Sequence, residues 1–183
     1  MFFALWPDGA WSSRLIEAAA PQVRAAGGRA LAQLDLHVTL CFLGAVGAGP
    51  LAALCERAGQ IQASSFELLF DRLEFWREAR IVAVTAARVP PAGRALAEAL
   101  AVAARELGLA PDIRPWRPHL TLVRGATVQR LSAEVAAAAS AELPLALPVS
   151  RFYLAQSQEL GREPAGAVEP RRYSTLASWP LRP

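Results

Sequence analysis

Apolar and polar positions alternate along the chain in patterns that predict interleaved strands and helices. Short runs rich in apolar and β-branched residues, bounded by glycine, proline or charged residues, predict strands. Apolar residues at helical spacing predict helices, and Gly27-Gly28 is expected to end the first of them. The expected strands cover residues 2–6, 36–43, 66–75, 81–87, 118–123, 145–155 and 173–179. The expected helices cover residues 11–26, 51–61, 93–107 and 131–139, and residues 157–172 are expected to form a surface loop.

Strand pairs without a helix between them decide the expected fold class. The charged turn Arg77-Glu78-Ala79-Arg80 separates two neighbouring strands, and such pairs are frequent along the chain. This pattern favours an α+β fold, with antiparallel sheets and helices packed on them, over a doubly wound parallel sheet. A chain of 183 residues that is 54% hydrophobic is long enough to bury one core. We therefore expect a single domain over residues 1–183.

Composition narrows the setting in which the protein acts. The apolar stretches fall far short of the roughly 20 residues that a membrane span needs, and no basic leader precedes Pro7. Cys41 and Cys55 form no C-x-x-C pair, so we expect reduced thiols, a cytoplasmic location and no membrane contact. All 19 basic residues are arginine, and the net charge of +3 is compatible with a nucleic-acid partner without proving one.

The two histidines of the chain carry the strongest functional signal. Each begins the same kind of tetrad, His37-Val38-Thr39-Leu40 and His119-Leu120-Thr121-Leu122. Side chains alternate across a strand, so each strand presents a histidine and a threonine on one face and two apolar residues on the other. If an approximate two-fold axis relates the two halves, the polar faces meet across a cleft and surround one small group, for which a tetrahedral phosphate is suited.

Imidazole chemistry predicts what such a cleft does. Neutral imidazole accepts a proton from water and imidazolium donates one to a departing oxygen, and both forms exist near neutral pH. The hydroxyls of Thr39 and Thr121 can donate hydrogen bonds to non-bridging phosphate oxygens. Arg117 and Arg124 flank the second tetrad and could add positive charge.

Other interpretations of the same residues are less favoured. A single histidine in an apolar strand is usually a structural residue, and a strand threonine usually reflects β-propensity, but the duplication argues against both. A metal site is not expected, because two histidines without a third, a cysteine pair or an acidic cluster fall short of the usual ligand set. No cofactor is expected either.

The quoted residues resemble those of the two-histidine (2H) phosphoesterase superfamily, specifically the RNA 2′,3′-cyclic phosphodiesterases, also called 2′-5′ RNA ligases. The resemblance covers essentially the whole chain and is most specific where Phe42-Leu43-Gly44 follows the first tetrad and Arg117-Pro118 precedes the second. The weaker matches lie near the ends of the chain, at Phe2-Phe3-Ala4-Leu5, at Phe152-Tyr153-Leu154 with Ser157, at Tyr173 and at Trp179-Pro180-Leu181.

The resemblance implies a fold of two lobes, each an antiparallel sheet with helices outside, related by a pseudo-two-fold axis with the active-site cleft between them. It implies that His37 is the proton donor to the leaving 3′ oxygen and that His119 is the base that activates water. Thr39, Thr121 and Arg124 would bind the substrate, although strict alternation along the strand turns Arg124 away from His119. Cys41 stands where relatives often carry a basic residue, and we expect it to pack or to line the groove rather than to act as a nucleophile.

The expected activity is hydrolysis of RNA 2′,3′-cyclic phosphate ends to 2′-phosphates without metal or nucleotide cofactor. The expected partner is RNA with such an end, tRNA fragments among the candidates, and no obligate protein partner is expected. The reverse joining of this end to a 5′-hydroxyl uses the same groups, so the motifs do not separate hydrolase from ligase. Two alternatives stay open: a sister activity on 2′-5′ linked oligonucleotides or small cyclic phosphates, and an inactive RNA-binding module.

Overall fold

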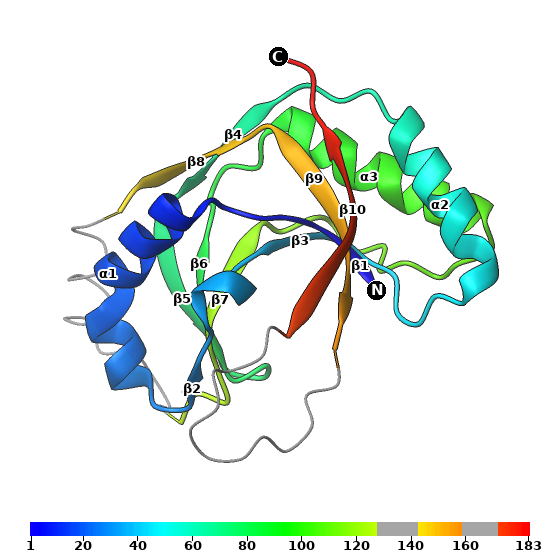
Figure 1. The fold of residues 1–183 in the computed structure, drawn as a ribbon. Coiled ribbons are helices and arrows are strands. Elements are labelled where there is room, and N and C mark those ends of the chain that lie inside the picture. Colours follow the sequence, from blue (N-terminus) through cyan, green and yellow to red (C-terminus); the bar gives the residue numbers. More distant parts are fainter. Residues whose placement is uncertain (128–142, 159–171) are drawn as a thin grey trace.

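The computed structural model of the protein describes residues 1–127, 143–158 and 172–183, and Figure 1 shows its elements. The α-helices in these ranges are α1 (Gly9–Ala26), α2 (Ala48–Gln60) and α3 (Pro91–Glu106), and a 3₁₀ turn, η1, covers Gln33–Asp35. The strands are β1 (Phe2–Leu5), β2 (Arg29–Ala30), β3 (Val38–Phe42), β4 (Phe66–Phe70), β5 (Arg72–Trp76), β6 (Ile81–Thr85), β7 (His119–Arg124), β8 (Leu145–Val149), β9 (Arg151–Ser157) and β10 (Tyr173–Pro180).

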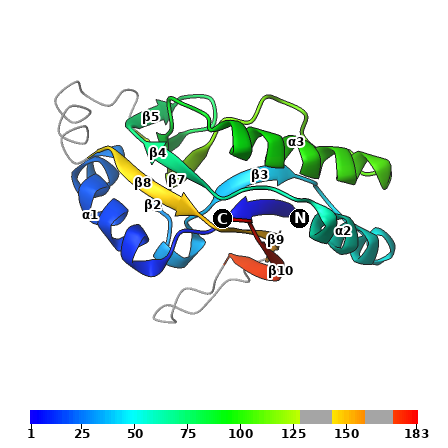
Figure 2. The same cartoon turned by 90° about the horizontal axis from the view of Figure 1, so that it is seen from above.

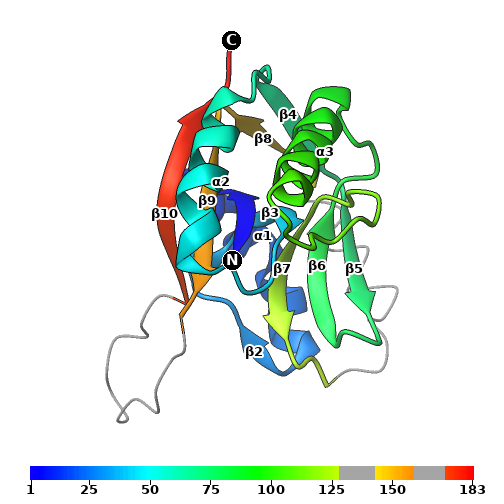
Figure 3. The ribbon, with the colours of Figure 1, turned by 90° about the vertical axis from the view of Figure 1, so that its right-hand side faces the viewer.

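One antiparallel sheet carries most of the strands, in the order β10-β9-β1-β3-β7-β6-β5, with β2 paired to β7 (Figure 3). Its two halves meet where β3 and β7 pair through Val38 and Leu120 alone. The α+β class and the antiparallel pairing are thus as expected, and the two expected lobes are the halves of one sheet. A second sheet consists of β4 and β8.

The helices pack on opposite ends of the large sheet. In Figure 1, α1 lies beside the β5-β6-β7 half, while α2 and α3 lie beside the half that contains β9 and β10. Contacts agree with this view, because α1 packs on β7, α3 on β3 and α2 on β10. Strands β4 and β8 lie between α1 and the other two helices (Figure 2). Helix α1 therefore lies on the opposite half of the sheet from β1 and β3, the strands nearest to it in the sequence.

The ends of the first helix follow from local chemistry. The carboxylate of Asp8 accepts a hydrogen bond from the N–H of Trp11 at 2.7 Å and caps the N-terminus of α1. Gly27 ends the helix with φ 61°, as the sequence predicted. A Cβ on Gly28 would lie 2.7 Å from the backbone oxygen of Arg124, so only glycine lets this turn approach the end of β7.

Two strand predictions were wrong in the same way. The expected strand at 66–75 is two strands, β4 and β5, and the expected strand at 145–155 is also two, β8 and β9. In each case the chain crosses to the other sheet, at Asp71 and at Ser150. The carboxylate of Asp71 fixes one crossing by accepting a hydrogen bond from the N–H of Ala87 at 2.9 Å.

The other predicted elements agree with the structure within three residues at each end. The short strand β2 was not predicted. The helix expected at 131–139 lies outside the described residues, as does most of the loop expected at 157–172.

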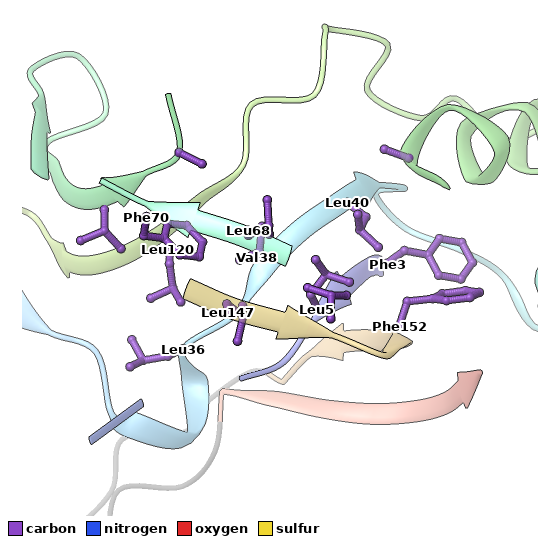
Figure 4. Close-up of a cluster of buried hydrophobic side chains, with 14 of the residues drawn as sticks. Phe3, Leu5, Leu36, Val38, Leu40, Leu68, Phe70, Leu120, Leu147 and Phe152 are labelled. Carbon is purple, nitrogen blue, oxygen red and sulfur yellow. The ribbon is translucent and has the colours of Figure 1, made fainter. Parts of the chain in front are cut away.

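The main hydrophobic core lies on one face of the large sheet, under the helices and the β4–β8 pair. Figure 4 shows side chains from both halves of the sheet meeting there, Phe3 and Val38 from one half and Leu120 from the other. Full burial of a side chain of this size contributes roughly 1.5–3 kcal/mol. In the described ranges, the buried cluster on the opposite face is small and consists of Phe2, Ala4 and Ala155, with Trp6 and Tyr173 packed against it. None of the helices in the described ranges has the length and apolar character that crossing a membrane requires.

Candidate active site

The two histidine tetrads lie side by side where the halves of the sheet join. Val38 pairs with Leu120 across this seam, and both side chains are fully buried in the core. The residues on either side of this pair are the polar members of the tetrads: His37, Thr39, His119 and Thr121. Because side chains alternate along a strand, these four residues lie on the face opposite the core. The expected two-fold relation is centred on this pair.

A β-bulge follows the threonine in each tetrad. On β3, Thr39 is opposite Ala4 and Cys41 is opposite Phe3, so Leu40 is an extra residue. On β7, Thr121 is opposite Ala83 and Val123 is opposite Val82, so Leu122 is an extra residue. An extra residue changes which face the following side chains occupy.

The bulge turns Arg124 toward the face that carries the two histidines and two threonines, where it lines one cavity with His37 and Thr39. The expectation that strict alternation turns Arg124 away was therefore wrong. Phe42 occupies the corresponding position on β3, lines the same cavity and has 53% of its surface exposed. The two halves of the site thus place an arginine and an aromatic ring at equivalent positions.

Each imidazole is oriented by the carbonyl two residues before it. Nδ1 of His37 lies 2.7 Å from the carbonyl oxygen of Asp35, and Nδ1 of His119 lies 2.9 Å from that of Arg117. A carbonyl can only accept a hydrogen bond, so Nδ1 donates in both rings. Nε2 of each histidine is consequently left for proton exchange with a substrate.

Burial shifts both histidines toward their neutral forms. It lowers the pKa of His37 to about 4, and the positive charges of Arg124 and His119 act in the same direction, against the carbonyl of Asp35. Burial also lowers the pKa of His119, helped by the charges of Arg117 and Arg124. Both rings are therefore neutral at neutral pH before an anion binds.

This leads to a prediction for NMR, in which the ring signals of two histidines are easily resolved. Without phosphate, His37 should titrate well below the roughly 6.5 of a free imidazole. Saturating inorganic phosphate should raise the pKa of both rings, because an adjacent anion stabilises imidazolium. The control is sodium chloride at equal ionic strength. A His37 signal that titrates near the free value without phosphate, or that phosphate leaves unchanged, would contradict the described environment.

Aromatic residues lie against both imidazoles, and the sequence analysis named Phe2 and Tyr173 for their resemblance to the family but gave no aromatic residue a place in the site. The His37 ring has three aromatic neighbours, Trp6, Phe2 and Tyr173, with ring centroids 5.0, 5.0 and 4.6 Å away. The His119 ring lies 4.6 Å from the ring of Trp76. No motif marks Trp6 or Trp76, and the four aromatic residues come from separate strands and loops.

Asp35 joins two parts of the site, and its role was also not predicted. It is 3% exposed, and its carbonyl orients His37. Its carboxylate accepts a hydrogen bond from the N–H of Arg172 at 3.0 Å. Arg172 therefore lies beside Arg124, His37 and Tyr173 in a cavity of about 320 Å³.

Two residues discussed from the sequence have roles away from the phosphate position. Cys41 is buried, and burial raises the pKa of its thiol to about 11, so it is inert as a nucleophile and packs in the core. The side chain of Arg117 forms an ion pair with Glu74 and lies over the ring of Trp76, 4.5 Å from its centroid. In the part of the chain that the structure describes, no three His, Cys, Asp or Glu side chains gather as a metal site.

A sequence model of the 2′-5′ RNA ligase superfamily matches residues 6–160. The chain belongs to this superfamily. A curated member, the RNA 2′,3′-cyclic phosphodiesterase of Escherichia coli strain K12, is 35% identical over 128 residues, which cover 69% of this chain and 72% of that protein. The family expected from the tetrads is confirmed.

Solved structures of the superfamily share the fold. The crystal structure of E. coli LigT with 3′-AMP superposes with a TM-score of 0.81 at 29% identity, over 98% of this chain and 96% of that one. The structure of E. coli LigT with phosphate has a TM-score of 0.78 at 27% identity, over 100% of this chain and 96% of that one. This relative thus binds a nucleotide and a phosphate.

Proposed function

We propose that this protein hydrolyses 2′,3′-cyclic phosphodiester ends of RNA to 2′-phosphomonoesters, with His37 and His119 as the acid–base pair. The observation that carries the proposal is the matched pair of imidazoles, each with Nδ1 held by a carbonyl and Nε2 left for the substrate. The similarity to an RNA 2′,3′-cyclic phosphodiesterase supports the choice of substrate.

The reaction is an in-line displacement at phosphorus. Nε2 of His119 takes a proton from water while the water oxygen forms a bond to phosphorus. The bond from phosphorus to the 3′ oxygen breaks, and Nε2 of His37 donates a proton to that oxygen. The product keeps the phosphate on the 2′ oxygen, and a proton returning from His119 to His37 through solvent restores the starting state.

Threonines and an arginine stabilise the charge on the phosphate. Thr39 and Thr121 donate hydrogen bonds to the non-bridging oxygens, where negative charge grows in the transition state. Arg124 faces the same space and offers a planar pair of donors. A bound anion favours the protonated form of His37, because it opposes the burial and the charge of Arg124 that lower the pKa of this ring.

The cavity on the His37 side fits the terminal nucleoside. Phe42 and Tyr173 line it, and exposed aromatic rings bind bases of any sequence by stacking. RNA ends produced by cleavage, tRNA fragments among them, are the proposed substrates. The free thiols of Cys41 and Cys55 agree with the expected cytoplasmic location.

The function is tested with an RNA that ends in a 2′,3′-cyclic phosphate, incubated with the protein in the presence of EDTA. We expect turnover to a 2′-phosphate at the same rate with and without chelator, because the histidines and Arg124 supply the charge that a metal would otherwise provide. Terminal-phosphate analysis by mass spectrometry and selective phosphatase treatment identifies the product. Activity that is lost with chelator and recovered with one divalent metal would contradict the metal-free mechanism. Tight RNA binding without turnover would indicate an RNA-binding module instead.

A further inference from the structure

The imidazole of His119 is held by contacts that lead back to one carboxylate, that of Glu74. Oε2 of Glu74 accepts a hydrogen bond from the indole N–H of Trp76 at 2.6 Å and another from the guanidinium of Arg117. The Trp76 ring lies against the His119 ring, with their centroids 4.6 Å apart. The main-chain carbonyl of Arg117 accepts the hydrogen bond of Nδ1 of His119. Glu74 therefore joins the two residues that hold this imidazole.

The pairing of three strands places Glu74 on the face of the sheet that carries the tetrads. Glu74 and Trp76 are two residues apart on β5, so their side chains point to the same face, whereas Phe75 between them packs against the core. On β6, Ala83 is opposite Glu74 on one side and opposite Thr121 of β7 on the other. Figure 3 shows β5, β6 and β7 side by side in this order.

The charges around the two histidines differ in sign. Burial lowers the pKa of His37, and the charged groups that act on it, Arg124 and His119, lower it further. Burial also lowers the pKa of His119, and the carbonyl of Arg117 opposes this effect. The charges of Arg117 and Arg124 then lower the pKa of His119 further, while the carboxylate of Glu74 raises it. Within the described ranges, the two matched tetrads are thus made unequal by one carboxylate.

The other charged groups on this side line a groove of about 510 Å³ beside His119. Glu78 lies at the turn between β5 and β6, and Arg114 forms an ion pair with Asp112 before β7. In the described ranges, the carboxylate that binds both neighbours of His119 is that of Glu74. Glu78 therefore provides a second carboxylate on the same side against which the role of Glu74 can be measured.

We propose that Glu74 is a positioning residue for His119: its carboxylate holds Trp76 against the imidazole and pairs with the guanidinium of Arg117. The proposal rests on the proposed function, in which His119 takes a proton from water and becomes imidazolium. A carboxylate near a histidine favours this charged form, and so stabilises the base as it accepts the proton. Because Glu74 acts through Trp76 and Arg117, it should affect kcat rather than KM.

Two substitutions of Glu74 separate its charge from its hydrogen bond. Glu74→Gln removes the charge and keeps an oxygen that can accept from the indole of Trp76, whereas Glu74→Ala removes both. The matched control is Glu78→Gln, which removes one negative charge from an exposed residue of the same groove and leaves Glu74 in place. Thermal unfolding confirms that each variant is folded at the assay temperature.

NMR titration of the two histidines tests the positioning without any substrate. The pKa of His119 should fall below its wild-type value in Glu74→Gln and in Glu74→Ala. The reason is that the charge opposing burial is lost while the charge of Arg117 is left unpaired. His37 should titrate as in the wild type, and Glu78→Gln should leave both rings near their wild-type values.

Kinetics with a nucleoside 2′,3′-cyclic phosphate test the consequence for turnover. Glu74→Ala should lower kcat by about tenfold, the effect of losing one hydrogen bond, with KM within about twofold of wild type. Glu74→Gln should recover part of this loss, because it keeps an acceptor for Trp76. The double variant Glu74→Ala/Trp76→Phe should lose little more than Glu74→Ala alone, since residues that act through one contact are not additive. Glu78→Gln should turn over at the wild-type rate.

The positioning role is overturned if His119 titrates in Glu74→Gln as in the wild type, or if Glu78→Gln shifts it equally. It is also overturned if Glu74→Ala raises KM and leaves kcat unchanged. If Glu74→Ala does not fold, Glu74→Gln carries the test through the pKa of His119. Failure of the proposed function has a different result, because the wild type then hydrolyses no cyclic phosphate. In that case, a lowered pKa of His119 in Glu74→Gln still supports the positioning role, and an unchanged one removes it.

Discussion

Replacing either His37 or His119 with alanine should lower turnover of a 2′,3′-cyclic phosphate by about 10²- to 10⁴-fold, the contribution of one general acid or base. A substrate with a far better leaving group needs little help from an acid. It should therefore restore the rate of His37→Ala much more than that of His119→Ala, which still lacks the base for water. The measurement is the turnover rate of each variant with the cyclic phosphate and with the better leaving group, at saturating substrate. It separates the role of the acid from that of the base.

Folding must be checked in the same experiment, because both histidines lie against aromatic rings. Thermal unfolding of each variant should match wild type closely enough that the protein is fully folded at the assay temperature. If the better leaving group restored the rates of both variants equally, or that of His119→Ala more, the proton donor and the proton acceptor would be assigned the wrong way round.

Thr39→Val and Thr121→Val should each lower turnover by about ten- to a thousandfold, as expected when one hydrogen-bond donor to the transition state is lost. Valine has nearly the same shape and suits a strand, so the bulge and the histidine positions should be kept. The matched control is Thr175→Val, an exposed threonine on β10, which should have the wild-type rate. Steady-state kinetics with a cyclic mononucleotide measures all three.

Wild-type turnover in both tetrad variants would make these threonines structural. The contacts to the phosphate oxygens would then have to come from Arg124 and Arg172, which line the adjacent cavity.

Local patterns predicted most elements, but not how the chain passes between sheets. The spacing of apolar residues and the local composition depend on a few neighbouring residues. Helices such as α1 and strands such as β6 were therefore predicted close to their observed ends. The separation of β4 from β5 depends on the pairing of Phe66–Phe70 with Leu145–Val149, far away in the sequence. The charged pair Asp71-Arg72 inside this segment does not by itself show such a change of partner.

The tetrads predicted which histidines and threonines lie together on one face of the sheet, since a duplicated motif is visible without any structure. The face on which Arg124 lies was predicted wrongly because of the bulge. A bulge is a shift in the pairing register of two strands, which the sequence of one strand does not reveal. The same applies to Phe42, whose exposure follows from the bulge on β3. Asp35 was missed because it acts partly through its main-chain carbonyl, which every residue type possesses.

The central place of β1 in the sheet has a consequence for synthesis on the ribosome. All four residues of this strand are buried, and it lies between β3 and β9. Its second partner begins only at Arg151, so the emerging chain carries an apolar strand with one open edge until most of the polypeptide has been made. Such an edge invites pairing with other chains. Chaperone binding near the N-terminus during translation would protect the nascent enzyme from aggregation until β9 arrives.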